Sequence, residues 1–288
     1  MDLDSLRSAF TDIVLTPWGL GILGLCVGSF LNVVIHRVPK MMEQQWQAEA
    51  RSVLGLPEAS TAALSLSQPA SRCPSCGHAI RWYENIPVLS WLALRGKCSS
   101  CGTRISMRYP LIELTTAALF AACAQHFGNQ PTTLLWCGFM AALVAASAID
   151  WDTTILPDDI TLPLLWAGLV IAGLGWSLPL SESLWGAVAG YLSLWCVYWL
   201  FKLTTGKDGM GYGDFKLLAA LGAWLGWQMV LPIVLGSSII GAVIGIGMKL
   251  SHKLREGVYV PYGPFLAGAG IVVALAGSAR VLSWLGWA

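Results

Sequence analysis

Long apolar segments constrain this chain more than any other feature of its sequence. A helix that crosses a bilayer needs about 20 mainly apolar residues, in a range of roughly 17 to 25. Eight such segments can be drawn, of which the sixth is short: residues 17–35, 111–127, 132–149, 160–177, 184–201, 215–227, 229–248 and 263–285. The sequence therefore predicts an all-α polytopic protein of the lipid bilayer with about eight transmembrane helices, or seven if the sixth and seventh segments form one broken helix.

The composition excludes an ordinary soluble domain. Charged residues make up 11% of the chain and hydrophobic residues 56%, whereas soluble domains contain about 25% charged residues. The net charge of +1 also gives no reason to expect a nucleic-acid partner. The polytopic membrane class is therefore the starting point for every later inference.

The positions of lysine and arginine predict the orientation. With the N-terminus outside, 15 of these residues fall in segments that face the cytoplasm, and only Arg7 and Arg280 fall outside. Such an excess is typical of cytoplasmic loops. The polar segment 36–110 is therefore predicted to be cytoplasmic. The acidic N-terminus lacks the features of a removable signal peptide.

Two cysteine pairs lie in this polar segment, in a module at about residues 71–104 between the first and second predicted helices. The pairs are Cys73-Pro-Ser-Cys76-Gly and Cys98-Ser-Ser-Cys101-Gly, with 21 residues between them. Four thiolates at this spacing are typical of a structural zinc site, in which every ligand position is filled. Disulfides or a redox pair are the alternative, but the cytoplasm is reducing and disfavours disulfides. The pattern therefore predicts a structural zinc ion.

Two aspartates lie at predicted helix ends. Asp150 closes the third apolar segment, and Asp214 follows the glycine-rich stretch 209–213. Asp214 could be a helix N-cap, but the glycines permit close approach of another chain segment. Two neighbouring carboxyls can share one proton and activate a water molecule, as in aspartic proteases. The sequence therefore predicts that Asp150 and Asp214 form a catalytic pair.

The other aspartates near these helix ends have simpler interpretations. Asp158 and Asp159 precede the fourth segment, where helix capping explains one or both. Asp208 lies in a polar loop, where solvation is sufficient explanation.

Several ordered motifs run along the chain, namely GSFLNVVIHRVP (28–39), the two cysteine pairs around YENIPVLSWLALRGKC, RYPLIELTTA (108–117), AIDWDTTILPD (148–158), GYGDFK (211–216) and VPYGPFLA (260–267). These motifs resemble those of the bacterial type IV prepilin peptidases, and the resemblance covers nearly the whole chain. Tyr262 stands where the family often has phenylalanine, a mild change.

The resemblance implies a bifunctional enzyme of the inner membrane, with a membrane aspartyl protease of the G-x-G-D type whose catalytic residues match Asp150 and Asp214. Such enzymes remove the leader of type IV prepilins or type II secretion pseudopilins after a glycine. They then methylate the new N-terminal residue, usually phenylalanine, with S-adenosylmethionine. Gly96 and Lys97 match positions linked to methyl transfer. The implied division is an N-terminal region at 17–127, with the zinc module and the first two helices, and a peptidase domain at 128–288.

The residues themselves do not locate the methyl-donor site, because the sequence lacks the glycine-rich fingerprint of a nucleotide-binding fold. Glu84 and Glu113 are candidate bases or donor-site groups. A charge at a helix end is the simpler interpretation of Glu113, and Lys97 can be a cationic loop residue.

Three other functions remain open at this stage. The protein could be a peptidase without methyltransferase activity, a proton-coupled transporter, or a zinc-stabilised scaffold or redox protein. A transporter more often places its carboxylates near the bilayer midplane and contains an internal repeat. The sequence leaves open the secretion system served and the oligomeric state.

Overall fold

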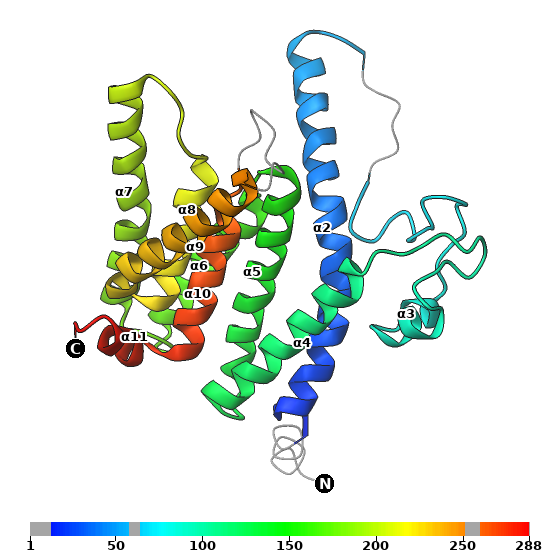
Figure 1. Cartoon of the computed structure of the whole chain (residues 1–288), viewed down its shortest axis with the longest axis horizontal. Coiled ribbons are helices and arrows are strands. Elements are labelled where there is room, and N and C mark those ends of the chain that lie inside the picture. The colour runs from blue at the N-terminus through cyan, green and yellow to red at the C-terminus, as the bar shows by residue number, and fades with distance from the viewer. Residues whose placement is uncertain (1–12, 58–63, 251–259, 288) are drawn as a thin grey trace. The chain divides into compact units, whose positions relative to one another are not determined.

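The computed structural model describes residues 13–57, 64–250 and 260–287, and the fold of this part is helical (Figure 1). The chain divides into two compact units, Met1–Ala141 and Ala142–Ala288, with the division inside α5. The helices are α2 (Pro17–Val53), η1 (Trp82–Asn85), α3 (Leu89–Ala93), α4 (Arg108–Phe127), α5 (Thr133–Thr153), α6 (Asp158–Gly173), α7 (Leu180–Thr205), α8 (Tyr212–Leu225), η2 (Trp227–Met229), α9 (Val230–Leu250), α10 (Gly263–Ala276) and α11 (Ser278–Trp284).

The first unit is built on a close pair of helices, α2 and α4. Pro17 occupies the first turn of α2, and the Thr16 hydroxyl caps the helix by accepting the Gly19 N–H at 3.1 Å. Gly24 and Gly28 face α4 so closely that a methyl group on either would lie 2.6 Å from a backbone Cα of that helix. Small residues allow this approach, as is common in membrane helices.

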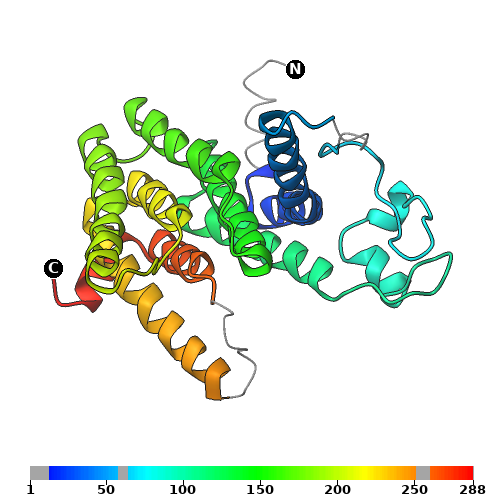
Figure 2. The same cartoon turned by 90° about the horizontal axis from the view of Figure 1, so that it is seen from above.

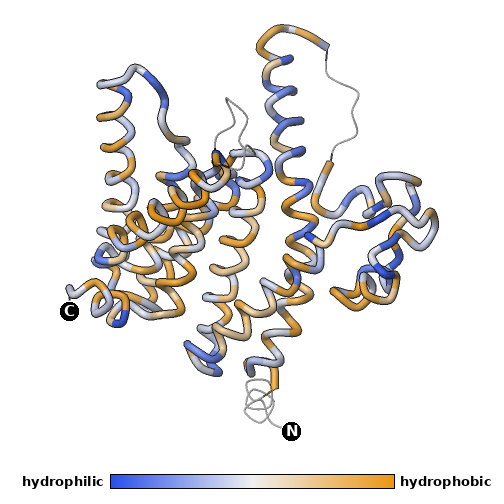
Figure 3. Tube along the Cα trace, viewed as in Figure 1, coloured by the Kyte–Doolittle hydropathy of each residue, from blue (hydrophilic) through white to orange (hydrophobic). Residues whose placement is uncertain are grey.

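Helix α2 is longer than the sequence predicted. The first apolar segment was predicted at residues 17–35, but α2 continues through Pro39 to Val53 as one helix of 37 residues. At 1.5 Å per residue it spans about 55 Å, well beyond the roughly 30 Å of a hydrocarbon core. Its first half is apolar and its second half polar (Figure 3). We therefore expect the polar half of α2 to lie outside the hydrocarbon core of the bilayer.

The cysteine module forms a separate lobe of the first unit, beside α2 and α4 (Figures 1 and 2). Arg37 of α2 holds the segment that leads into the module. Its guanidinium donates to the carbonyls of Ser65 at 2.7 Å and Pro69 at 2.6 Å, and Arg37 is itself buried. These contacts attach the segment that precedes the module to the first helix.

The second unit is arranged around α8, which packs against α6, α7 and α10. Every residue of α8 from Asp214 to Trp224 except Lys216 is buried. A methyl group on Gly186 of α7 would lie 2.1 Å from the carbonyl oxygen of Gly222, so these helices touch backbone to backbone. The short sixth apolar segment of the sequence therefore corresponds to a helix of only 14 residues, which other helices cover.

Each of the eight predicted segments falls on a helix, but the count of eight spans is not confirmed. Four helices are long and apolar enough to cross a membrane, namely α2, α5, α7 and α9 with the preceding η2. A fifth span is possible if α10 and α11, bent by 107° at their junction, count as one. Helices α6 and α8 are too short by themselves. Large apolar side chains, including Trp166, Trp185 and Ile239, are exposed on these helices, as expected for surfaces that face lipid.

The contact between α7 and α8 yields a prediction about stability. We expect Gly186→Ala to lower the free energy of unfolding by about 3 kcal/mol, the upper end for overpacking, because the added methyl group meets backbone rather than a movable side chain. Gly245→Ala on α9 is the matched control, since a methyl group there has no neighbour within 4 Å. Thermal unfolding in detergent measures both variants, and equal stability of the two would contradict the packing described.

Candidate active site and metal centre

Asp150 lies in the last turn of α5 and is almost completely buried, with 4% of its surface exposed. The helix ends at Thr153, and Thr154 then takes a positive φ of 54°, which few residues other than glycine adopt. The Thr154 N–H donates to the Asp150 carbonyl at 2.8 Å. A carboxyl group with so little access to solvent needs partners from the protein itself.

Asp214 lies in the first turn of α8 and is also buried, with 7% exposed. The N-cap of α8 is Gly211, three residues earlier, and the Asp214 N–H donates to the Gly211 carbonyl at 3.3 Å. The alternative that Asp214 is an N-cap is therefore wrong. Its carboxyl group instead has the backbone N–H of the N-cap Gly211 as a hydrogen-bond partner.

The structure brings Asp150 and Asp214 close enough for their charges to interact, although 64 residues separate them in the sequence. Leu156 lies beside two glycines next to this pair, Gly213 and Gly263. A methyl group on Gly213 would lie 2.7 Å from the Leu156 Cβ, and one on Gly263 would lie 3.1 Å from its Cδ1. The glycine before Asp214 is thus required by a close approach, as the glycine-rich stretch suggested.

Gly263, the first residue of α10, holds the carboxyl group of Asp150. Its N–H donates to Asp150 Oδ2 at 3.0 Å in a buried hydrogen bond, and a methyl group on Gly263 would lie only 2.7 Å from the same oxygen. The preceding Tyr262 is fixed to α9, where its hydroxyl contacts the hydroxyls of Ser237 at 2.7 Å and Ser238 at 3.0 Å. The start of α10 is therefore anchored where its first amide meets Asp150.

An ion pair joins the starts of α6 and α8. Lys216 Nζ lies 2.7 Å and 2.8 Å from the two carboxylate oxygens of Asp158. The N-cap of α6 is Pro157, so capping does not explain Asp158 or Asp159, which lie in the first turn. Lys216 is two residues after Asp214, and the pair thus helps to fix the turn that carries this aspartate.

Asp208 has partners that the sequence did not reveal. It accepts the Tyr198 hydroxyl at 2.6 Å and pairs with Lys202 Nζ at 2.9 Å, both on α7. The Tyr198 hydroxyl, and then the Lys202 ammonium group, hold the pKa of Asp208 below its usual value. The Tyr198 ring also contacts the rings of Tyr212 and Phe215 on α8. The loop between α7 and α8 is therefore held against α7 through Asp208 near its start and through Tyr212 just after its end.

The four cysteines of the module converge as predicted. Their sulfur atoms all lie within 4.8 Å of one another, with 3.9 Å between Cys73 and Cys101 and 4.0 Å between Cys76 and Cys98. Two sulfurs on one tetrahedral zinc ion lie roughly 3.8 Å apart, given Zn–S bonds of about 2.3 Å. A disulfide needs about 2.05 Å, and all four thiols are free. The cluster could hold a metal ion.

The two cysteine pairs have the same backbone geometry. In each, the glycine after the second cysteine has a φ of +71° and donates to the carbonyl of the first cysteine, at 2.9 Å for Gly77 and 3.0 Å for Gly102. In each, the first cysteine donates to the carbonyl two residues beyond its partner, at 2.9 Å. The repeated turn is the local reason why two distant C-x-x-C-G motifs present their sulfurs alike.

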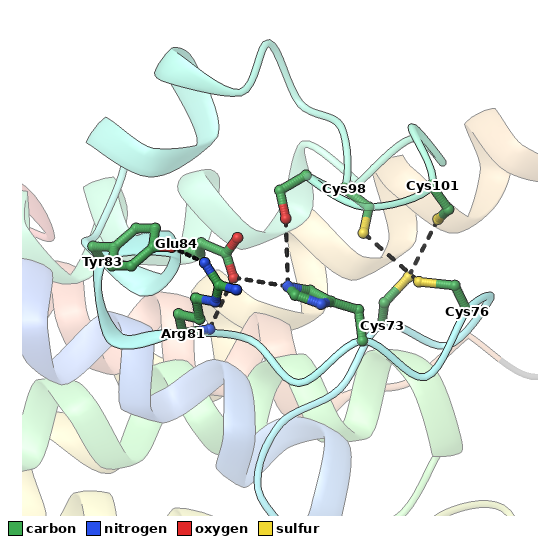
Figure 4. Close-up of polar contacts among 9 residues, drawn as sticks. Cys73, Cys76, Arg81, Tyr83, Glu84, Cys98 and Cys101 are labelled. Atoms are coloured by element: carbon green, nitrogen blue, oxygen red, sulfur yellow. Dashed lines mark hydrogen bonds and ion pairs between the residues drawn. The ribbon is translucent and has the colours of Figure 1, made fainter.

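Glu84 is fixed beside the second cysteine pair (Figure 4). Its carboxylate accepts the Arg81 backbone N–H at 2.8 Å and contacts His78 Nε2 at 3.2 Å. The Ser99 hydroxyl, and then the Arg81 N–H, lower the pKa of Glu84 to about 2. The group is therefore a carboxylate throughout the physiological pH range.

Gly96 and Lys97, which the sequence resemblance linked to methyl transfer, lie elsewhere in the first unit. Gly96 is buried with a φ of +65°, and a methyl group on it would lie 2.8 Å from the Trp91 ring. Lys97 is exposed and pairs through its backbone with Arg104 in an isolated antiparallel bridge.

Glu113 is more than a charge at a helix end. It is buried in α4 and accepts the Val88 N–H at 2.7 Å, and the Ser29 hydroxyl of α2 is a second partner. Val88 has a φ of 59°, which is unusual for a β-branched residue. Glu113 thus joins the cysteine module to the α2–α4 pair.

Models of two protein families match parts of this chain. The chain belongs to the type IV leader peptidase family, whose model matches residues 137–246, while the model of the bacterial peptidase A24 N-terminal domain matches residues 22–127. No solved structure matches the chain.

Curated relatives match over most of their length and are named prepilin leader peptidase/N-methyltransferase. The protein from Stutzerimonas stutzeri is 54% identical over 273 residues, which cover 93% of each chain. The one from Pseudomonas aeruginosa is 52% identical over 273 residues, 93% of this chain and 92% of its own. The one from Aeromonas salmonicida is 51% identical over 257 residues, 88% of each.

The cysteine geometry predicts the effect of removing a ligand. We expect a change of any one of the four module cysteines to serine to lower the bound metal from about one ion per chain, because three thiolates hold the ion less well than four. Metal content is measured by mass spectrometry on protein purified under reducing conditions. Cys196→Ser, outside the module, is the control and should leave the content unchanged. Full retention of metal in all four variants would rule the site out.

Proposed function

We propose that this protein removes the leader of type IV prepilins or type II secretion pseudopilins after a glycine and then methylates the new N-terminal residue. The observation that carries the proposal is the buried carboxyl pair of Asp150 and Asp214, in a chain about half identical to relatives named for both activities. A carboxyl pair in an apolar helix bundle has a clear chemical use and no evident structural one.

In the proposed cleavage, one carboxylate takes a proton from a water molecule, which attacks the carbonyl carbon of the glycine that precedes the cleaved bond. The other carboxyl group, protonated at the start, donates its proton to the leaving nitrogen as the peptide bond breaks. The two groups titrate as a pair. The Gly263 amide keeps the Asp150 carboxyl group in one orientation, so the base and the acid face the same peptide bond.

We place the cleavage site at the cytoplasmic edge of the inner membrane. The excess of lysine and arginine in segments on that side supports this orientation. Asp150 at the end of α5 and Asp214 at the start of α8 occupy helix ends rather than helix centres. This position suits a substrate whose cleavage site lies just outside the bilayer, and it is less suited to the midplane relay of a transporter.

Methylation follows cleavage for a chemical reason. The nitrogen that receives the methyl group is an amide in the precursor, and its lone pair is delocalised into the peptide bond. Only cleavage yields a nucleophilic amine. S-adenosylmethionine would supply the methyl group. We assign this activity to the N-terminal region at 17–127, with Gly96, Lys97, Glu84 and Glu113 as candidate residues, and cleavage to the domain at 128–288.

The metal in the proposed function is zinc with a structural role. All four ligand positions of the cluster are cysteines, so none remains for a substrate or a water molecule. The two pairs belong to short loops with little apolar core of their own, and a metal ion would supply much of the free energy that holds them together.

The first functional prediction concerns the carboxyl pair. We expect Asp150→Asn and Asp214→Asn each to abolish cleavage and methylation of full-length prepilin, because no free amine forms. Asp159→Asn, an exposed residue in the first turn of α6, is the control and should keep both activities. N-terminal mass analysis of the pilin is the measurement. The aspartate variants should still methylate pilin that has already been cleaved. Cleavage of prepilin by a variant that carries both substitutions would disprove the assignment of this pair.

A second prediction tests the support of Asp150. Gly263→Ala should reduce the rate of cleavage by about 100-fold, because the added methyl group displaces the carboxyl group that the amide holds. Gly268→Ala, on the same helix with no neighbour within 4 Å, should have no effect. Both variants are assayed for methylation of cleaved pilin as a test of folding. Equal cleavage rates for the two would show that the Gly263 contact is unimportant.

A further inference from the structure

The cysteine module contains a hollow beside its second cysteine pair. It has a volume of about 580 Å³, within the range of small-molecule sites. It lies between η1, α3, the tip of the second cysteine pair and the residue His78 that follows the first pair. We call it the module hollow. It is lined by His78, Arg81, Tyr83, Glu84, Ser90, Ala93, Leu94, Ser99 and Ser100.

The module hollow carries fixed charges of both signs. Glu84 supplies a carboxylate held in place by the Arg81 N–H and His78. Arg81 supplies a guanidinium that contacts the Tyr83 hydroxyl and lies 5.9 Å from the centre of that ring. Figure 4 shows these groups facing the loop that carries Cys98 and Cys101. A ligand with a cationic group and a carboxylate would therefore find a partner for each, with an aromatic ring nearby.

The second hollow described in the chain has the opposite character. It lies between α7, the segment from Trp227 to Val234, and the C-terminal residues Leu282 and Trp287, and its lining is mainly apolar. These helices are among those apolar enough to span a membrane. Transfer of a zwitterionic nucleoside from water to such a surface is costly, because its charges would lose their hydration without replacement.

We propose that the module hollow binds the methyl donor, a sulfonium nucleoside with an amino-acid end, with Arg81 facing the carboxylate and Glu84 favouring the cationic groups. This inference rests on the proposed methyltransferase activity. In the transfer, the pilin amine attacks the methyl carbon as the carbon–sulfur bond breaks. The electron pair stays on sulfur, which becomes a neutral thioether, and the amine releases a proton to solvent.

The proposal also gives a physical role to Gly96. Its backbone N–H donates to the Trp91 carbonyl at 2.8 Å, and the Trp91 indole donates to the Ile105 carbonyl at 3.3 Å. A side chain on Gly96 would displace Trp91 and, with it, the end of α3 that carries Ala93 and Leu94. Gly96 therefore shapes one wall of the hollow without lining it.

The test uses the metal-loaded full-length protein in lipid nanodiscs, with binding measured by calorimetry. The probes are S-adenosylmethionine and S-adenosylhomocysteine, which lacks the methyl group and the sulfonium charge. We expect Arg81→Ala to weaken binding of both by tenfold or more, because a hydrogen bond to a charged group is lost. Glu84→Gln should weaken the binding of S-adenosylmethionine, which carries the sulfonium charge, more than the binding of S-adenosylhomocysteine. Ala93→Phe, which fills the hollow, should weaken both.

The controls separate this site from a general loss of structure. Arg104→Ala removes an exposed arginine of the same module outside the hollow and should bind both probes normally. Metal content and prepilin cleavage should be unchanged in every variant. If the wild type methylates cleaved pilin but Arg81→Ala and Ala93→Phe bind the donor normally, the proposed donor site is wrong and the proposed methyltransferase activity is unaffected. If the wild type neither binds the donor nor methylates cleaved pilin, the proposed second activity itself fails.

Discussion

The burial of two carboxyl groups is the constraint on which the second unit depends. An ionised carboxylate is costly to remove from water, and two of them close together are more costly still. Two local contacts offset part of this cost. The Gly263 amide donates a hydrogen bond to Asp150, and the positive end of α8 lies beside Asp214. The first contact is possible only because α5 ends where α10 begins, so the position of Gly263 follows from the carboxyl group that it meets.

The frame around the pair consists of polar contacts at helix ends and glycine contacts between helices. Lys216 with Asp158, and Tyr198 with Asp208 and Lys202, fix the two sides of the turn that carries Asp214. Deeper in the bundle, the backbone contact of Gly186 with Gly222 holds α8 against α7. A rigid surround matters because a shift of about 1 Å in a catalytic group can reduce a rate 100-fold.

The sequence predicted the parts that depend on local pattern. Apolar runs located the helices, and the C-x-x-C-G spacing predicted the cysteine cluster, because its turn is encoded within six residues. Apart from the aspartate pair and the cysteine cluster, contacts between distant segments were not predicted. Nothing near Asp150 indicates that Gly263 holds it, although a glycine before a proline at a helix start was a signal. Asp208 and Glu113 have partners 10 and 25 residues away, and only the packed helices show them.

The central claim is that a buried aspartate pair cuts the precursor and so creates the amine that is then methylated. A time course with wild-type protein in a bilayer, full-length prepilin and isotopically labelled methyl donor tests it most directly, with N-terminal mass analysis at each point. We predict that cleaved, unmethylated pilin appears first and is converted to the methylated form. Uncut prepilin that carries a label at the residue after the cleavage glycine would contradict the account.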